Sequence, residues 1–110
     1  QRIVYEYLGR EPSAADGRAR WTSMLDTAYA FLEQRMQDRT WAAGDAFSLA
    51  DCAAAPALLY ADWTHAIPRR LVSVWAYRDR LLAQPSYARA LDEARPYRHL
   101  FPLGAPEGRD

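Results

Sequence analysis

Apolar side chains recur along this chain with the period of an α-helix, and this spacing constrains the fold more than any other feature. In residues 18–39, the apolar positions follow one another at intervals of four, three, four and four residues: Trp21, Leu25, Ala28, Leu32 and Met36. Because an α-helix turns once in about 3.6 residues, these positions form one stripe along about six turns. We predict a long amphipathic helix whose stripe packs against other elements.

Composition extends this expectation to the whole chain. Alanine is abundant and β-branched residues are few and scattered, which favours an all-α fold. The 110 residues suit one domain, 1–110. The 14 basic residues are all arginine and balance 14 acidic ones, which is not the charge pattern of a protein that binds nucleic acid or an anionic membrane. No apolar run approaches the about 20 residues that span a bilayer, so we expect a soluble, cytoplasmic protein.

The same spacing predicts the remaining elements. Residues 1–9 read as the end of a helix that stops at Gly9, and residues 10–17 read as a loop. Residues 40–47 form a turn that leaves Trp41 exposed. Proline and glycine make the residues after Pro96 irregular, although their apolar side chains can pack back on the helices.

Two further helices follow the turn, and a short third one lies between Pro85 and Pro96. The helix that begins at Ser48 is apolar nearly all round, so we expect it to be the central and most buried element, kinked at Pro56. The next is expected to start with Pro68 at its first position and to end near Gln84.

A capping motif marks the start of the central helix. Ser48 and Asp51 stand three residues apart, so the serine hydroxyl can accept from the Asp51 amide while the carboxylate accepts from the Ser48 amide. This is a capping box with Asp in the usual Glu position. Phe47 precedes the cap, but the facing position carries Cys52, so we expect a weak hydrophobic staple.

These features together resemble a known family. A glycine four residues before the Ser-x-x-Asp cap, an alanine-rich helix and a Trp/Tyr helix ending in Gln-Pro-Ser are similar to the C-terminal domain of bacterial glutathione S-transferases. The resemblance covers essentially the whole chain and implies an all-helical bundle. It also implies that an upstream thioredoxin-like domain, absent from this chain, binds the co-substrate glutathione and acts on its thiolate.

The resemblance further implies a division of roles within such a protein. This chain then supplies no catalytic nucleophile and no cofactor or metal site, and is inactive alone. It supplies the wall of a pocket for small apolar electrophiles and part of a homodimer interface. The pocket residues that the resemblance implies are aromatic: Tyr5, Tyr60, Trp63 and Phe101.

Several alternatives stay open. Domains of this kind also serve as non-catalytic docking modules, and fold alone does not separate the two functions. The chain opens on Gln1 within an apolar-periodic stretch, so we expect it to begin inside a longer protein, and the upstream sequence would decide between enzyme and module. Tyr60 and Trp63 suit a packed core as well as a pocket.

The remaining reactive residue types suggest no further chemistry. Cys52 lies among alanines, so an inert buried thiol is expected in spite of its position near a helix start. Two histidines, His65 and His99, without a third ligand nearby do not predict a metal site. The basic stretch on the fourth helical segment reads as a solvent-facing surface: Arg69, Arg70, Arg78 and Arg80.

Overall fold

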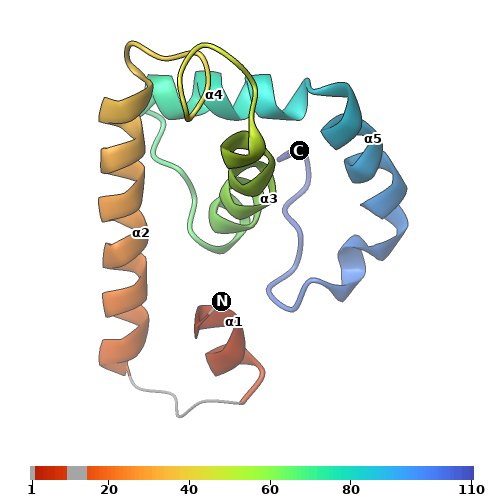
Figure 1. Ribbon diagram of the computed structural model, residues 1–110. Helices are drawn as coiled ribbons and strands as arrows, with labels where there is room; N and C mark the ends of the chain where they lie inside the picture. Colours follow the sequence, from red (N-terminus) through yellow and green to blue (C-terminus); the bar gives the residue numbers. More distant parts are fainter. Residues whose placement is uncertain (1, 10–14) are drawn as a thin grey trace.

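The computed structural model describes residues 2–9 and 15–110, and over these residues the regular elements are helices (Figure 1). The order is α1 (Arg2–Tyr7), α2 (Ala15–Met36), α3 (Leu49–Thr64), α4 (Val72–Leu82), α5 (Pro85–Ala94) and the 3-10 helix η1 (Arg95–Leu100). The predicted all-α class is therefore confirmed. Residues 10–14 of the predicted loop lie outside the described residues, and α2 starts earlier than predicted, at Ala15.

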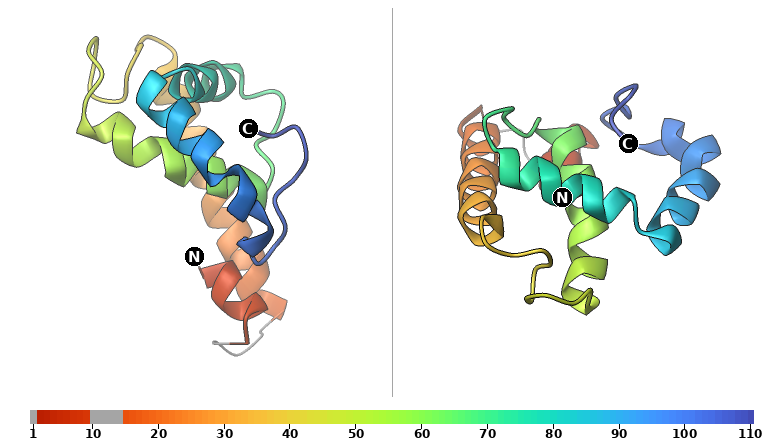
Figure 2. Two further views of the ribbon diagram at one scale, coloured as in Figure 1. Left: turned by 90° about the vertical axis from the view of Figure 1, so that its right-hand side faces the viewer. Right: turned by 90° about the horizontal axis from the view of Figure 1, so that it is seen from above.

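The helices surround α3, which passes through the middle of the molecule. In Figure 1, α2 stands on one side of α3, α5 on the other, and α4 crosses above it. The view from above in Figure 2 agrees, with α4 running across α3 from α2 toward α5. The core lies where α2, α3 and α4 meet: Tyr29, Met36, Ala55, Leu58, Ile67, Val74, Tyr77 and Leu81 are buried there.

The predicted stripe of α2 is correct at four of its positions and wrong at one. Leu25, Leu32 and Met36 pack in or against the core and Trp21 is half-buried, whereas Ala28 is exposed. The next residue, Tyr29, takes the buried place with 2% of its surface exposed. A tyrosine fits there because its hydroxyl donates to the backbone oxygen of His65 at 2.7 Å.

Helix α3 is central but is not buried all round, which corrects the prediction. Its buried positions are Asp51, Ala55, Leu58, Leu59 and Asp62, on one side of the helix. The opposite side faces solvent, with Leu49 85% exposed, and Cys52 is exposed and not the buried thiol that we expected. An alanine side chain is small enough to be either buried or exposed at little cost in free energy. The abundance of alanine could therefore not indicate which face of α3 is covered. The helix continues through Pro56.

The start of α4 differs from the prediction because a distant residue sets it. Pro68 lies in the preceding loop, where its carbonyl oxygen accepts from the amide of Leu71 at 3.0 Å. The helix begins at Val72 with no side-chain cap of its own. Glu33 of α2 supplies one instead, accepting from the amides of Ser73 at 3.2 Å and Val74 at 2.9 Å. The first turn of α4 is therefore fastened to α2.

The turn and the C-terminal region also differ from the prediction. Trp41 is half-buried against the core, and its ring meets Phe47 edge to face at 5.1 Å. Residues after Pro96 are partly regular, since η1 runs from Arg95 to Leu100.

Within the described residues, no helix combines the length and apolar character needed to cross a bilayer.

Candidate functional site

The carboxylate of Asp51 anchors the helix that carries the candidate site. It is fully buried and accepts from the Ser48 amide at 2.9 Å, while Ser48 Oγ accepts from the Ala50 amide at 3.3 Å, so the predicted capping box is present. Two more donors reach it, the Ala42 amide at 2.8 Å and the Tyr77 hydroxyl at 2.7 Å. Burial raises the pKa of Asp51, but these hydrogen bonds outweigh it and hold the pKa below its ordinary value.

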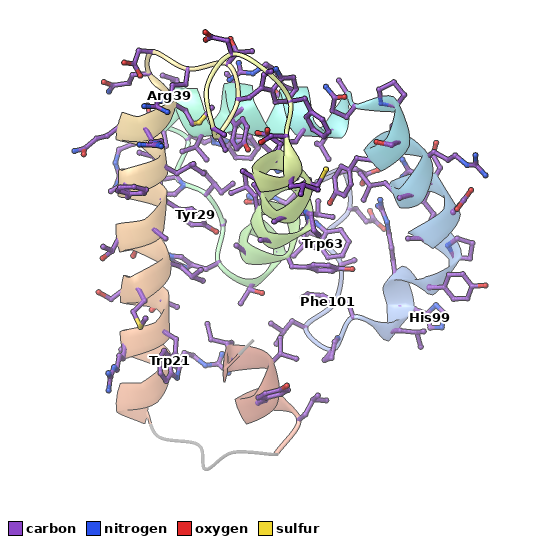
Figure 3. The ribbon with its side chains drawn as sticks, in the orientation of Figure 1. Trp21, Tyr29, Arg39, Trp63, His99 and Phe101 are labelled. Carbon is purple, nitrogen blue, oxygen red and sulfur yellow. The ribbon has the colours of Figure 1, made fainter. Side chains whose placement is uncertain are left out.

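At the other end of α3, three of the four predicted pocket residues form one cluster. The rings of Tyr60, Trp63 and Phe101 stand 5.4 Å from one another in every pairing, two edge to face and one stacked. We call them the aromatic triad. Figure 3 shows Trp63 and Phe101 side by side between α3 and the segment that follows η1. One turn of α3 sets the spacing of Tyr60 and Trp63, whereas Phe101 arrives from far along the chain.

Two grooves lie on the two sides of the triad. The larger groove, of about 650 Å³, is lined from α1, α2 and α3 by apolar side chains such as Ile3, Trp21 and Leu25. The smaller groove, of about 450 Å³, runs between α3, α5 and η1 and contains Trp63, Tyr97 and Arg98. Tyr60 and Phe101 line both, so they form the wall that the grooves share. Tyr5 lies among the lining residues of neither groove.

Hydrogen bonds and ion pairs fix the C-terminal tail, residues 101–110, which carries Phe101. Trp63 Nε1 donates to the backbone oxygen of Arg109 at 3.1 Å, and the Asp110 carboxylate pairs with Arg95 and with Arg98 at 2.6 Å. These two arginines lower the pKa of Asp110 to about 2. In Figure 1 the tail is drawn between α3 and the segment formed by α5 and η1. The tail is thus tied to the helices by a carboxylate and by main-chain oxygens.

A buried ion pair beneath the tail was missed by the sequence analysis. Arg78 was predicted to face solvent, but it is only 4% exposed. Its guanidinium lies 3.4 Å from the carboxylate of Asp62, which is fully buried, and donates to the Arg109 oxygen. A signal existed, because Asp62 follows Leu58 by four residues on the buried stripe of α3, and a carboxylate there needs a partner.

Two of the other three predicted arginines also have partners, whereas Arg70 is exposed as predicted. Arg69 stacks over Trp75 at 4.6 Å, and Arg80 donates to the carbonyl oxygen of Thr40 at 3.1 Å. His65 pairs with Asp26 at 2.8 Å and lies parallel to the ring of Tyr29. His99 Nδ1 donates to the carbonyl oxygen of Pro96, within its own turn, at 2.9 Å. Among the residues that the structure describes, no cluster of three or more potential metal ligands occurs.

Comparison with known proteins agrees with the helical arrangement. The family model of the glutathione S-transferase C-terminal domain matches residues 22–85, from α2 to the first residue of α5. This match includes the capping box and both α3 residues of the triad. No curated protein and no solved structure matches the chain.

Proposed function

Since residues 22–85 match its model, this chain belongs to the family of glutathione S-transferase C-terminal domains, and we propose that its larger groove holds the electrophile that a glutathione thiolate attacks. The observation that carries the proposal is the groove itself. Its walls are apolar, its volume of about 650 Å³ suits a small molecule, and Tyr60 and Phe101 close one side.

The chemistry of conjugation requires such walls more than it requires acid or base groups. A thiolate adds fastest to an electrophile that is held beside the sulfur, in a site from which water is excluded. Flat side chains such as Trp21, Tyr60 and Phe101 orient an aromatic electrophile by stacking and displace water from it. Of the predicted pocket residues, Tyr60 and Phe101 line the larger groove, and the Trp63 ring packs edge to face against Phe101.

Glutathione itself is proposed to bind to a separate thioredoxin-like domain. The larger groove has almost no polar lining that could recognise a charged tripeptide: its lining residues are apolar except Thr64 and the Tyr60 and Trp21 ring heteroatoms. The 110-residue chain alone is therefore expected to bind electrophiles without conjugating them. Conjugation by this chain above the uncatalysed rate would contradict the division of roles.

A homodimer completes the proposal, with a second copy of the chain as partner. On α2, Met24 and Phe31 are 55% and 65% exposed, and the exposed Ala28 stands between them. Their spacing of four and three residues places them on one helical face. Met24 and Ala28 also line the larger groove, and the described residues leave Phe31 uncovered, so a second copy would pack against Phe31 beside the mouth of the groove.

Binding of an apolar electrophile to the isolated chain tests the groove. We expect 1-chloro-2,4-dinitrobenzene, without glutathione, to quench the part of the tryptophan fluorescence that comes from Trp21 at the groove wall. Ala28→Phe places a large ring at the groove and is expected to weaken binding at least tenfold. Ala53→Phe adds the same ring to an exposed position of α3 that lines no groove, and is the matched control.

The outcomes separate the two candidate functions. Equal affinities of the Ala28→Phe and Ala53→Phe variants for the electrophile would contradict the proposed electrophile pocket. A docking module without catalysis would then remain, because it needs the fold but no small-molecule groove.

A further inference from the structure

Two arginines face the buried carboxylate of Asp62, and one of them belongs to the C-terminal tail. Arg78 of α4 lies 3.4 Å from one carboxylate oxygen, Oδ2, and Arg109 of the tail lies 3.6 Å from the other, Oδ1. Oδ1 also accepts from the amide of Ile67 at 2.9 Å, whereas Oδ2 has no hydrogen-bond partner among the residues that the structure describes. A buried carboxylate that is incompletely hydrogen-bonded is stabilised by a second positive charge nearby. Asp62 and Arg78 therefore form a seat for the side chain of Arg109.

The backbone of Arg109 is held at the same place as its side chain. Its carbonyl oxygen accepts from the guanidinium of Arg78 and from Trp63 Nε1, the latter at 3.1 Å. Its own Nη1 donates to the backbone oxygen of Asp62 at 3.3 Å. Asp62 and Trp63 are neighbours in α3, so the side chain and the backbone oxygen of Arg109 bind adjacent residues of one helix. Displacement of the side chain from Asp62 would therefore also move the oxygen that Trp63 contacts.

Trp63 connects Arg109 to the wall of the larger groove. An indole has a single N–H donor, and in Trp63 this donor bonds to the Arg109 oxygen, which fixes how the ring is turned. The ring meets Phe101 edge to face at 5.4 Å, and Figure 3 shows the two side chains next to each other. Phe101 lines the larger groove, whereas Trp63 and Arg109 do not. Arg109 therefore acts on this groove only through the residues that lie between.

We propose that Arg109 is a positioning residue for the electrophile pocket, which acts through the Trp63 indole on the Phe101 ring at the groove wall. The inference rests on the proposed function, because it concerns the same groove. When Arg109 leaves its seat, the Trp63 indole loses its acceptor and Phe101 loses a neighbour of fixed orientation. Aromatic side chains that must be ordered when a ligand binds lower the affinity for that ligand.

NMR of the 110-residue chain follows the groove and the seat separately, because Trp21 lines the larger groove and Trp63 contacts Arg109. The probe is 1-chloro-2,4-dinitrobenzene without glutathione, and its affinity is measured from the indole signal of Trp21. Arg109→Gln removes the charge that faces Asp62. We expect it to speed the solvent exchange of the Trp63 indole proton and to weaken binding about fivefold. Arg109→Lys keeps a point charge there and is expected to restore binding to within about twofold.

Two comparisons show whether Arg109 acts through Trp63. Arg89→Gln is the matched control and is expected to leave binding unchanged, because Arg89 is in an exposed ion pair with Glu93 and lines neither groove. Trp63→Phe keeps an aromatic ring but removes the donor, and is expected to weaken binding as much as Arg109→Gln. The double variant is then expected to bind no more weakly than Trp63→Phe alone, because residues that act in series do not contribute additively.

Failure of this inference is distinguishable from failure of the proposed function. The positioning role is overturned if Arg109→Gln binds the electrophile as tightly as Arg89→Gln, if it leaves the exchange of the Trp63 indole unchanged, or if the losses from Arg109→Gln and Trp63→Phe multiply. In each of these cases the electrophile pocket stands. If the unaltered chain does not bind the electrophile, the proposed function fails and the positioning role fails with it.

Discussion

Asp51 accepts more hydrogen bonds than a capping box requires. Besides the Ser48 amide, it accepts from the Ala42 amide and the Tyr77 hydroxyl, so one buried carboxylate joins the turn, α3 and α4. Replacement by a small apolar residue leaves these donors buried without an acceptor. The importance of this residue therefore comes from tertiary contacts as well as from the helix start.

We expect Asp51→Ala to lower the free energy of unfolding by about 3 kcal/mol, since several buried donors lose a charged acceptor. Ser48→Ala removes only the local cap and is expected to cost about 1 kcal/mol. Urea denaturation followed by circular dichroism measures both variants. Equal losses for the two would show that the contacts with Ala42 and Tyr77 add nothing to the cap.

Acidification tests the carboxylates whose pKa is lowered in the folded protein. Asp110 has a pKa of about 2 beside Arg98 and Arg95, against an ordinary 3.8. Its stabilising effect is present above the ordinary value and is lost as the pH falls through the folded one. The pKa values of Asp51 and Glu33 are lowered as well: burial raises both, and hydrogen bonds outweigh it.

The free energy of unfolding should therefore fall steeply below about pH 4.5 and stay nearly level from pH 5 to 7. Asp110→Asn should make the fall between pH 4 and 2 shallower, because one of the titrating groups is gone. Urea midpoints measured at half-unit pH intervals give both slopes. Parallel curves for the two proteins would mean that Asp110 keeps an ordinary pKa.

At the scale of elements, α4 depends on α2 for its first turn. Its cap residue, Leu71, contributes no side-chain hydrogen bond, and Glu33 accepts from the Ser73 and Val74 amides instead. A carboxylate near a helix N-terminus also interacts favourably with the helix dipole. The amides of Ser73 and Val74 therefore have their carboxylate acceptor only when α4 is docked on α2.

Glu33→Gln is expected to destabilise the fold by about 1 kcal/mol, since the charged cap is replaced by a weaker one. The amides of Ser73 and Val74 should exchange with solvent faster, and exchange measured by NMR detects this directly. Glu93→Gln is the control, because Glu93 is in an exposed pair with Arg89 that contributes little. Unchanged exchange at Ser73 and Val74 would contradict the cap.

At the scale of the whole molecule, the exposed apolar face of α2 bears on assembly. Met24 and Phe31 are too exposed to stabilise the single chain, so a substitution there should leave the fold intact. We expect Phe31→Arg to shift the proposed dimer toward monomer, since a charge buried in the interface must be desolvated. Sedimentation velocity over a range of concentrations measures the shift. Leu49→Arg, at another exposed apolar position, is the control.

The features of the fold that depend on residues close together in the sequence could be predicted, and those that depend on distant contacts could not. The helical class, the long α2 and the Ser48 to Asp51 cap follow from residues a few positions apart, so they could be predicted. The partial burial of α3 could not, because alanine accepts either environment and only the neighbouring helices decide which side is covered. The same holds for exposed Cys52 and half-buried Trp41.

For the candidate site, the aromatic residues could be named from the sequence, but their arrangement depends on how the helices pack. The resemblance to a known family named Tyr5, Tyr60, Trp63 and Phe101 as pocket candidates. The path of the tail brings Phe101 against Tyr60 and Trp63, whereas Tyr5 of α1 lines neither groove. The burial of Arg78 on Asp62 arises in the same way. Contacts between residues far apart in the chain depend on how the helices pack, and no local pattern encodes that packing.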